Sequence, residues 1–380
     1  MRQMVCEWRK LFRLPALWVF LALCLAFNTL LILEHSSGRD FFRDVSAVAK
    51  DLGQQVTPSF LEGLSRRGAG ESRDILIAST AALEDIFETY DTGELEAFYK
   101  GVVSSSPLAA RWMEWKYGLL SGRVAHLAAK DAALTLYAGP ITHDSHQFLF
   151  STLLRSVVAE GAILSMLATL YLLGYERMFR TESLIFTART GRALRRIKVL
   201  SALPASLVLY ALLAVGSLCP YFALWDYGGV WSASVSSQFN YLTDMLYSRP
   251  FLTWGDFTVA GYLAAALALG AALCAAFALL AAVCGILIRN TYGAALALIL
   301  LCASGLSLTV LLAQAKLWPL YFLSCFQPAG VWLCIGGWFT ELGLSAAIPW
   351  QETVSTLWSL LLAGASAALA LRQTNRKDLL

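Results

Sequence analysis

Six long apolar runs dominate this chain of 380 residues. Each is about 20 residues or longer, the length that crosses the roughly 30 Å hydrocarbon core of a bilayer as a helix. The fourth is long enough that it must tilt or protrude, and its alanines, with Gly270 and Gly285, would give a smooth face for close helix contact. The pattern predicts an all-α polytopic membrane protein with six transmembrane helices, at residues 14–33, 148–173, 199–219, 257–288, 292–313 and 353–371.

The segment 34–147 between the first two runs has a different character. It is charged and mixed, and its apolar residues recur every three or four positions, as at Leu83, Ile86 and Phe87. This is the spacing of a helix with one buried face, and no alternation typical of strands competes with it. The segment is therefore predicted to be a helical insert between the first and second transmembrane helices.

The stretch 316–350 is apolar and aromatic but unlikely to form a straight span. It is interrupted by Pro319, Pro328, Gly336, Gly337, Gly343 and Pro349. Two short helices that dip back into the membrane fit this pattern, provided that other helices bury their free backbone groups. A hairpin of two complete spans is the alternative, and it would leave the orientation of the tail 372–380 unchanged.

The first 13 residues predict an amphipathic helix at the membrane surface. Trp8 and Phe12 share its apolar face, whereas Lys10 and Arg13 lie elsewhere. Such a helix places its apolar side in the headgroup layer. The alternative is a positively charged flank that only orients the first span. Pro15 disfavours helical geometry at the residue before it, so a bend is expected there.

Composition and charge agree with a membrane protein and orient it. The chain is 58% hydrophobic and only 14% charged, and its net charge of +3 is too small to indicate a nucleic-acid partner. Basic residues gather in 1–13, in 177–198, at Arg289 and in the tail 372–380. The segments 220–256 and 316–352 hold only Arg249 and Lys316. Because positive charge is retained in the cytoplasm, both termini are predicted to be cytoplasmic and 34–147 extracytoplasmic.

The cysteines and the first run add two expectations. None of the eight cysteines lies between His35 and Phe150, so an exported insert needs no disulfide bonds. A bridge between Cys325 and Cys334 is less favoured than two free thiols. The first run lacks a signal-peptidase site and is expected to stay in the protein as a signal anchor.

Motifs for catalysis are absent from the sequence. There is no phosphate-binding P-loop, no GxGxxG, no HExxH, no C-x-x-C and no GxSxG, so the chain is predicted to be a non-enzymatic transport subunit that would use ATP only through a partner. His143, Asp144 and His146 are the only cluster with metal-ligand chemistry. A solvated loop is the favoured interpretation, and no metal is predicted.

Glu160 is the one acidic residue near the middle of a predicted span. An ionised carboxylate there costs several kcal/mol unless it is paired or hydrated. It could line a substrate pathway together with Asn28 of the first span. Alternatively it is a structural partner of Arg155, one turn away, or a protonated carboxyl. Arg155 itself lies near enough to the end of its span to reach water.

The segment 174–198 resembles the first cytoplasmic loop of type-2 exporter permeases of the ATP-binding-cassette superfamily. That loop begins E-R-E-x-G-T and continues through a pair of leucines towards a proline. The residues that carry the resemblance here are Glu176, Arg177, Thr181, Leu184, Ile185, Thr187, Arg192 and Lys198. The predicted coupling residues are these without Thr187, together with Gly191. The chain departs from the pattern at Met178, Arg180, Ser183 and Ala188. From the residues alone, a basic loop beside anionic lipid is the simpler interpretation.

What the resemblance implies is a transport mechanism in the plasma membrane of a bacterium. Two permease subunits, identical or homologous, would pack together, and the coupling segment of each would dock on a separate ATPase that holds the ATP and Mg²⁺; this chain has no cofactor of its own. The substrate would be exported, and amphipathic peptides or lipid-like compounds suit the aromatic 316–350 region. The alternative is a membrane sensor or immunity protein that binds a ligand through 34–147. An ion-driven transporter is less favoured because no internal repeat is visible.

Overall fold

The computed structural model describes residues 2–181, 191–243 and 248–377. Six of its helices are long and apolar enough to cross a membrane, as the sequence predicted. The prediction of an all-α polytopic protein is thus confirmed at the level of the helices. The long helices are α2 (Pro15–Glu34), α10 (Leu154–Met178), α12 (Gly191–Leu224), α13 (Val259–Leu287), α14 (Thr291–Gln314) and α17 (Gln351–Lys377).

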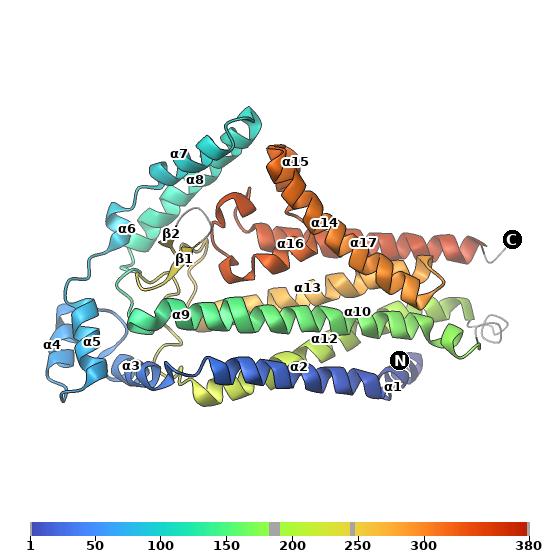
Figure 1. The fold of residues 1–380 in the computed structure, drawn as a ribbon, viewed down its shortest axis with the longest axis horizontal. Helices are drawn as coiled ribbons and strands as arrows, with labels where there is room; N and C mark the ends of the chain where they lie inside the picture. Colours follow the sequence, from blue (N-terminus) through green and yellow to red (C-terminus); the bar gives the residue numbers. More distant parts are fainter. Residues whose placement is uncertain (1, 182–190, 244–247, 378–380) are drawn as a thin grey trace.

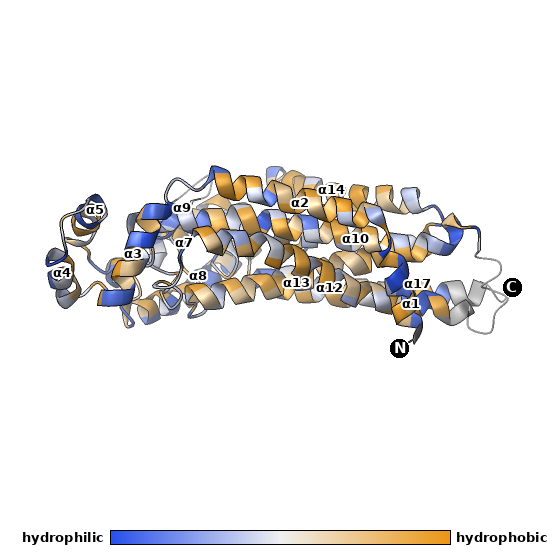
Figure 2. Ribbon diagram, turned by 90° about the horizontal axis from the view of Figure 1, so that it is seen from below, coloured by the Kyte–Doolittle hydropathy of each residue, from blue (hydrophilic) through white to orange (hydrophobic). Residues whose placement is uncertain are grey.

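These helices form an elongated bundle with α10 at its centre. α10 packs against α2, α12 and α13, and α17 lies along α13. α14 leaves the bundle obliquely (Figure 1). Only 6% of its apolar window is buried, against 67% for the span that contains α10. Figure 2 shows apolar residues along the shared length of the bundle and polar residues gathered towards its ends, the distribution expected of a multi-pass membrane protein.

Close helix contacts in the bundle depend on small residues, as expected for α13. A side-chain carbon at Gly270 would lie 2.5 Å from the hydroxyl of Tyr210 on α12, and one at Gly285 would lie 3.0 Å from Leu173 on α10. Tyr210 donates a hydrogen bond across this contact to the carbonyl of Leu267. Without side chains, these glycines let α12 and α10 approach the backbone of α13 closely.

The helical insert predicted at 34–147 divides into two packing groups. α3 (Arg39–Leu52), α4 (Pro58–Ser65) and α5 (Glu71–Thr80) join the main core at the end of the bundle opposite α1 (Arg2–Phe12). α6 (Ile86–Thr89), α7 (Thr92–Val102) and α8 (Pro107–Ala128) form a second core with Trp318 and Phe322 of α15 (Trp318–Ser324). The insert is helical, but it has no single core of its own.

The two largest differences from the predicted span boundaries are at the starts of the second and third spans. The second span was expected to begin at residue 148, but its helical path begins at Gly139 and passes through η1 (Gly139–Ile141), α9 (Thr142–His146) and the π-helix η2 (Gln147–Leu153). Pro140 suits the first turn of a helix, so it starts this path instead of breaking it. The third was expected at 199, but α12 begins at Gly191, because 192–198 holds only residues that tolerate a helix.

The loops hold short elements that the sequence indicated only in part. Two strands, β1 (Tyr241–Thr243) and β2 (Ser248–Pro250), pair antiparallel, a correction to the all-α prediction. The region 316–350 contains α15, α16 (Pro328–Leu333), η3 (Ile335–Gly337) and η4 (Gly343–Ser345). Helices of seven and six residues are too short to cross a bilayer, so the alternative of two further spans is wrong.

Both ends of the chain lie at one end of the bundle. α1 and the C-terminal part of α17 both lie at this end, and the helices of the insert lie at the other end (Figure 1). Leu14, between α1 and α2, has an extended backbone, as the following proline requires. An even number of spans places both termini on one side of a membrane.

Candidate functional site

Four charged residues meet where α1 crosses the ends of α10 and α12. We call Glu7, Lys10, Glu176 and Lys198 the α1 charge cluster. Lys10 Nζ lies 2.5 Å from Glu7 and 3.1 Å from Glu176. Lys198 forms an ion pair with Glu176 and lies 3.8 Å from Glu7. Glu7, Glu176 and Lys198 are buried. Two carboxylates and two ammonium groups therefore hold three helices together with no net charge.

Aromatic residues enclose this cluster. The indole of Trp8 donates a hydrogen bond of 3.0 Å to the carbonyl of Ser201 on α12. Trp8 and Phe12 contact each other edge to face, and the ammonium group of Lys10 lies 4.9 Å from the ring centre of Tyr175. Burial opposes the charge of Lys10, but its bonds to Glu7 and Glu176 outweigh burial and raise its pKa. Much of the predicted interfacial face of α1 thus packs on protein, whereas Arg13 is exposed.

The structure places the predicted coupling residues on both sides of residues 182–190. Arg177 donates to the carbonyls of Ile288 and Arg289, at the end of α13. The amide of Thr181 donates to the carbonyl of Glu176 at the end of α10. Leu184 and Ile185 lie outside the described residues, as does the side chain of Arg192, and Gly191 begins α12. Glu176 and Lys198 face α1, so any coupling role they have is to hold helices in position.

The two predicted pathway residues, Asn28 and Glu160, lie together in the bundle. The amide of Asn28 donates 2.8 Å to Glu160 and 3.0 Å to the hydroxyl of Ser217 on α12. Ser156 donates to the other carboxylate oxygen of Glu160. The alternative, an ion pair between Glu160 and Arg155, does not form. Arg155 instead donates hydrogen bonds to the Ser151 hydroxyl and the Leu333 carbonyl. Asn28 is completely buried, and its carbonyl oxygen has no partner.

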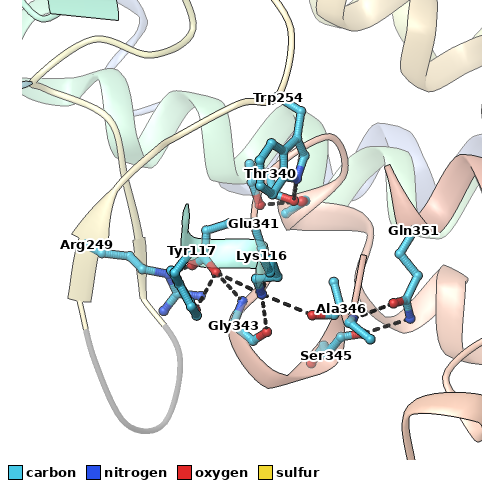
Figure 3. Close-up of polar contacts among 12 residues, drawn as sticks. Lys116, Tyr117, Arg249, Trp254, Thr340, Glu341, Gly343, Ser345, Ala346 and Gln351 are labelled. Carbon is cyan, nitrogen blue, oxygen red and sulfur yellow. Dashed lines mark hydrogen bonds and ion pairs between the residues drawn. The ribbon is translucent and has the colours of Figure 1, made fainter. Parts of the chain in front are cut away.

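A second charged cluster, at the opposite end of the bundle, ties the insert to the 316–350 region (Figure 3). Lys116 of α8 is completely buried. Its ammonium group donates to three carbonyls of one loop, those of Glu341 (2.8 Å), Gly343 (2.6 Å) and Ala346 (3.0 Å). It also lies 3.4 Å from the carboxylate of Glu341. We call Lys116, Tyr117, Arg249 and Glu341 the Lys116 cluster.

Glu341 is the shared acceptor of this cluster. It forms an ion pair with Arg249 of β2, and it accepts hydrogen bonds from the Tyr117 hydroxyl (2.9 Å) and the Gly343 amide (2.7 Å). Gly343 has φ +54°, and a side chain there would meet the hydroxyl of Tyr99. Glycine is suited to this left-handed turn. One carboxylate thus holds α8, β2 and the 341–346 loop in one arrangement.

The burial of Lys116 predicts a pH dependence of stability. Burial lowers its pKa from 10.5 to about 8, although Glu341 acts in the opposite direction. Between these values the unfolded chain holds a proton that the folded chain has released, so the free energy of unfolding should rise with pH there. The variant Lys116→Met should lose this rise. The measurement is the free energy of unfolding of the wild type and of Lys116→Met at a series of pH values from 8 to 10.5. The same rise of this free energy with pH in both proteins would contradict the prediction.

Sequence reasoning did not single out Lys116 or Glu341, although both left a signal. Lys116 lies on the apolar stripe of α8 that Met113, Tyr117 and Leu120 define. Glu341 is the only acidic residue of 316–350. A lone charge in an apolar segment needs a partner when it is buried. The partners, however, lie more than 200 residues apart in the chain.

The two histidines of the predicted cluster pack against aromatic rings, and the two cysteines of the 316–350 region are not bridged. His143 stacks on Tyr241, and His146 is buried among Phe150, Phe251 and Tyr262. The expectation of a solvated loop at this point is therefore wrong. Within the described residues no three His, Cys, Asp or Glu side chains gather as a metal site. Cys325 and Cys334 are free thiols.

Comparison of the chain with protein-family models, with curated proteins and with solved structures finds no match. The function is therefore argued from the chain's own residues.

Proposed function

We propose that this chain is the membrane-spanning subunit of an exporter that is driven by a separate ATPase, in the plasma membrane of a bacterium. The observation that carries the proposal is the α1 charge cluster. It joins α1 to the two helices that flank residues 182–190, the part of the segment that resembles the coupling loop of type-2 exporter permeases. A cytoplasmic position for this end of the bundle fits its basic residues.

The cluster gives the proposed coupling a physical route. A force on 182–190 reaches α10 through Glu176 and α12 through Lys198, and both side chains are tied to α1. Arg177 extends the connection to the end of α13. Packed helices joined in this way move as a body, and rigid-body gating driven from another chain requires such a unit. ATP and Mg²⁺ would be bound by the ATPase.

A second permease subunit is the proposed partner of α14. Its apolar window is almost entirely uncovered, and leucines on several sides are more than half exposed, including Leu300, Leu308 and Leu311. An apolar helix in lipid needs no protein contact. However, α14 diverges from its own bundle, and this leaves room for a second permease subunit, identical or homologous, to pack against it. Exposed faces of α2 are available to membrane lipid.

Co-purification tests whether the chain associates with a separate ATPase. The chain, isolated from native membranes in mild detergent, should carry an ATPase subunit in fixed stoichiometry, identified by mass spectrometry. Leu184→Asp and Ile185→Asp should abolish this association and ATP-dependent export, because a charge replaces the apolar contact offered to the partner. Ile75→Asp, on the half-exposed face of α5 at the other end of the bundle, is the matched control and should leave both unchanged. An ATPase retained by both coupling variants would contradict the proposal.

A sensor remains the second candidate because of a polar cavity beside the insert. It has a volume of about 310 Å³ and lies between α8 and the loops before α13. Among its lining residues are Gln54, Gln55, Arg123, Lys130 and Asp256. A preparation with no ATPase, in which a small polar ligand protects this region from hydrogen exchange, would favour the sensor over the exporter.

A further inference from the structure

A second cavity, of about 440 Å³, lies between α10, the β-hairpin and the 333–345 loops, at the end of the bundle away from α1. We call it the Arg155 cavity. One wall is polar and the other apolar, and both belong to the described part of the chain. The polar wall includes Gln147, Ser151, Arg155 and Ser345, with Thr243 and Arg249 also in the lining, and the apolar wall includes Leu242, Leu333, Leu342, Leu344 and Tyr321.

Arg155 brings a positive charge to this cavity without a carboxylate to balance it. One of its terminal nitrogens donates to the Ser151 hydroxyl (3.3 Å) and the Leu333 carbonyl (3.2 Å). Both are neutral acceptors. Its Nε is shielded from solvent and has no hydrogen-bond partner. A guanidinium group offers five N–H donors in a planar fork that matches a carboxylate or phosphate.

The neighbouring cations differ from Arg155 in this respect. Lys116 and Arg249 share Glu341, and Arg123 and Lys130 share Asp256. Among the described residues, Arg155 forms no ion pair within 4.0 Å. Glu352 accepts a hydrogen bond from the Thr353 hydroxyl and forms no ion pair with Arg155 among the described residues. The guanidinium group of Arg155 is only partly buried, so an anion that enters the cavity can reach it.

The backbone of the polar wall is unusual. Gln147, Ser151 and Arg155 follow one another at intervals of four residues, and the first two belong to the π-helix η2. π-Helical turns are rare and occur frequently at functional sites. On the facing loop, a side chain at Gly336 would come within 2.6 Å of the Ser151 hydroxyl. The loop can therefore lie against the π-helix only because this residue is glycine.

We infer that the Arg155 cavity binds an oxyanion, a carboxylate or a phosphate, that is carried on an apolar body. The oxyanion meets the guanidinium group of Arg155, with Ser151 and Gln147 beside it. The apolar body lies along the leucines and Tyr321. This inference does not depend on the proposed export function, because the site belongs to this chain alone and binding requires no ATPase.

Equilibrium binding of radiolabelled decyl phosphate tests the inference on the purified full chain in an uncharged maltoside detergent. Saturable binding at one site per chain is expected. Arg155→Gln should weaken it about ten-fold or more, because a charge-assisted hydrogen bond is lost. Thr243→Glu, an exposed position on the cavity rim, should also weaken it by repulsion. Arg66→Gln, a surface arginine of the insert, is the matched control and should bind normally.

Competition against decyl phosphate shows which ligand chemistry the cavity accepts and whether the ligand is a lipid or a soluble molecule. Decanoate should displace decyl phosphate, whereas decyltrimethylammonium and inorganic phosphate should not. Displacement by phosphatidylglycerol nanodiscs but not by phosphatidylcholine nanodiscs would identify a lipid headgroup, and no displacement by either would identify a soluble amphipathic anion. Equal binding by the wild type, Arg155→Gln and Thr243→Glu, with unchanged unfolding temperatures, would overturn the inference. So would equal competition by the cationic amphiphile.

Discussion

Glu341→Gln is expected to lower the free energy of unfolding by about 3–5 kcal/mol, the cost of removing one partner from a buried ion pair. Lys116 and Arg249 are both buried and both depend on this carboxylate. The neutral amide would leave two positive charges in a site that water does not reach. The expected result is therefore a protein in which α8 and the 341–346 loop separate at lower denaturant concentration.

The unfolding of purified protein in mixed maltoside and dodecyl sulfate micelles measures this effect. Glu62→Gln is the matched control, because Glu62 forms an exposed pair with Arg66 and such pairs contribute about 0–1 kcal/mol. Lys116→Met should cost less than Glu341→Gln, since it leaves a neutral Arg249–Glu341 pair. A smaller loss for Glu341→Gln than for Lys116→Met would show that Glu341 is not the centre of the cluster.

Lys198→Met is expected to have the second large effect, a loss of about 3 kcal/mol or more. The α1 charge cluster is neutral with its four residues, and without Lys198 it would hold two buried carboxylates against one ammonium group. The carbonyl of Leu172 would also lose the hydrogen bond that Lys198 donates. In the exporter that we propose, the same change should abolish ATP-dependent export, because α12 would no longer be tied to α10.

A double variant shows whether the stability lost in Lys198→Met comes from charge imbalance or from lost packing. Lys198→Met together with Glu176→Gln restores neutrality, and it should recover more than half of the lost unfolding free energy if the two residues are coupled. Lys50→Met, on the exposed surface of α3, controls for loss of a lysine and should change stability little. Additive losses from the two single changes would mean that the pair contributes through packing and not through charge.

The two clusters lie at opposite ends of one bundle and are built alike. Each places buried charges of both signs where segments distant in the chain meet. At one end α1 meets α10 and α12, and at the other α8 meets β2 and the 341–346 loop. Buried pairs contribute little net stability but strongly disfavour arrangements that separate the partners. We expect the clusters to specify where these segments attach.

Much of the architecture was predictable because its cause is local. A run of about 20 apolar residues forms a membrane helix whatever its neighbours are, and hydrogen bonds within the run satisfy its backbone. The breakers between 316 and 350 likewise predicted the short α15 and α16. The errors at Gly139 and Gly191 lay at helix ends, where hydropathy changes before helical structure does.

The candidate sites were only partly predictable because their causes are not local. Glu176, Lys198, Asn28 and Glu160 stood out in the sequence, but nothing there paired Lys198 with Glu7 or predicted the hydrogen bond between Asn28 and Glu160. Lys116 was hidden among apolar residues of α8. Their partners come from distant segments that only folding brings together.

By itself, the sequence determined that this chain forms six long apolar helices, a helical insert and a short-helix region near the end, because each follows from the periodicity of neighbouring residues. Only the tertiary structure decided that α1 is held by Glu176 and Lys198, that the insert is split between two cores, and that Arg155 faces a cavity without a counter-charge. Those outcomes depend on which buried charge finds a partner, and that is a property of the assembled bundle.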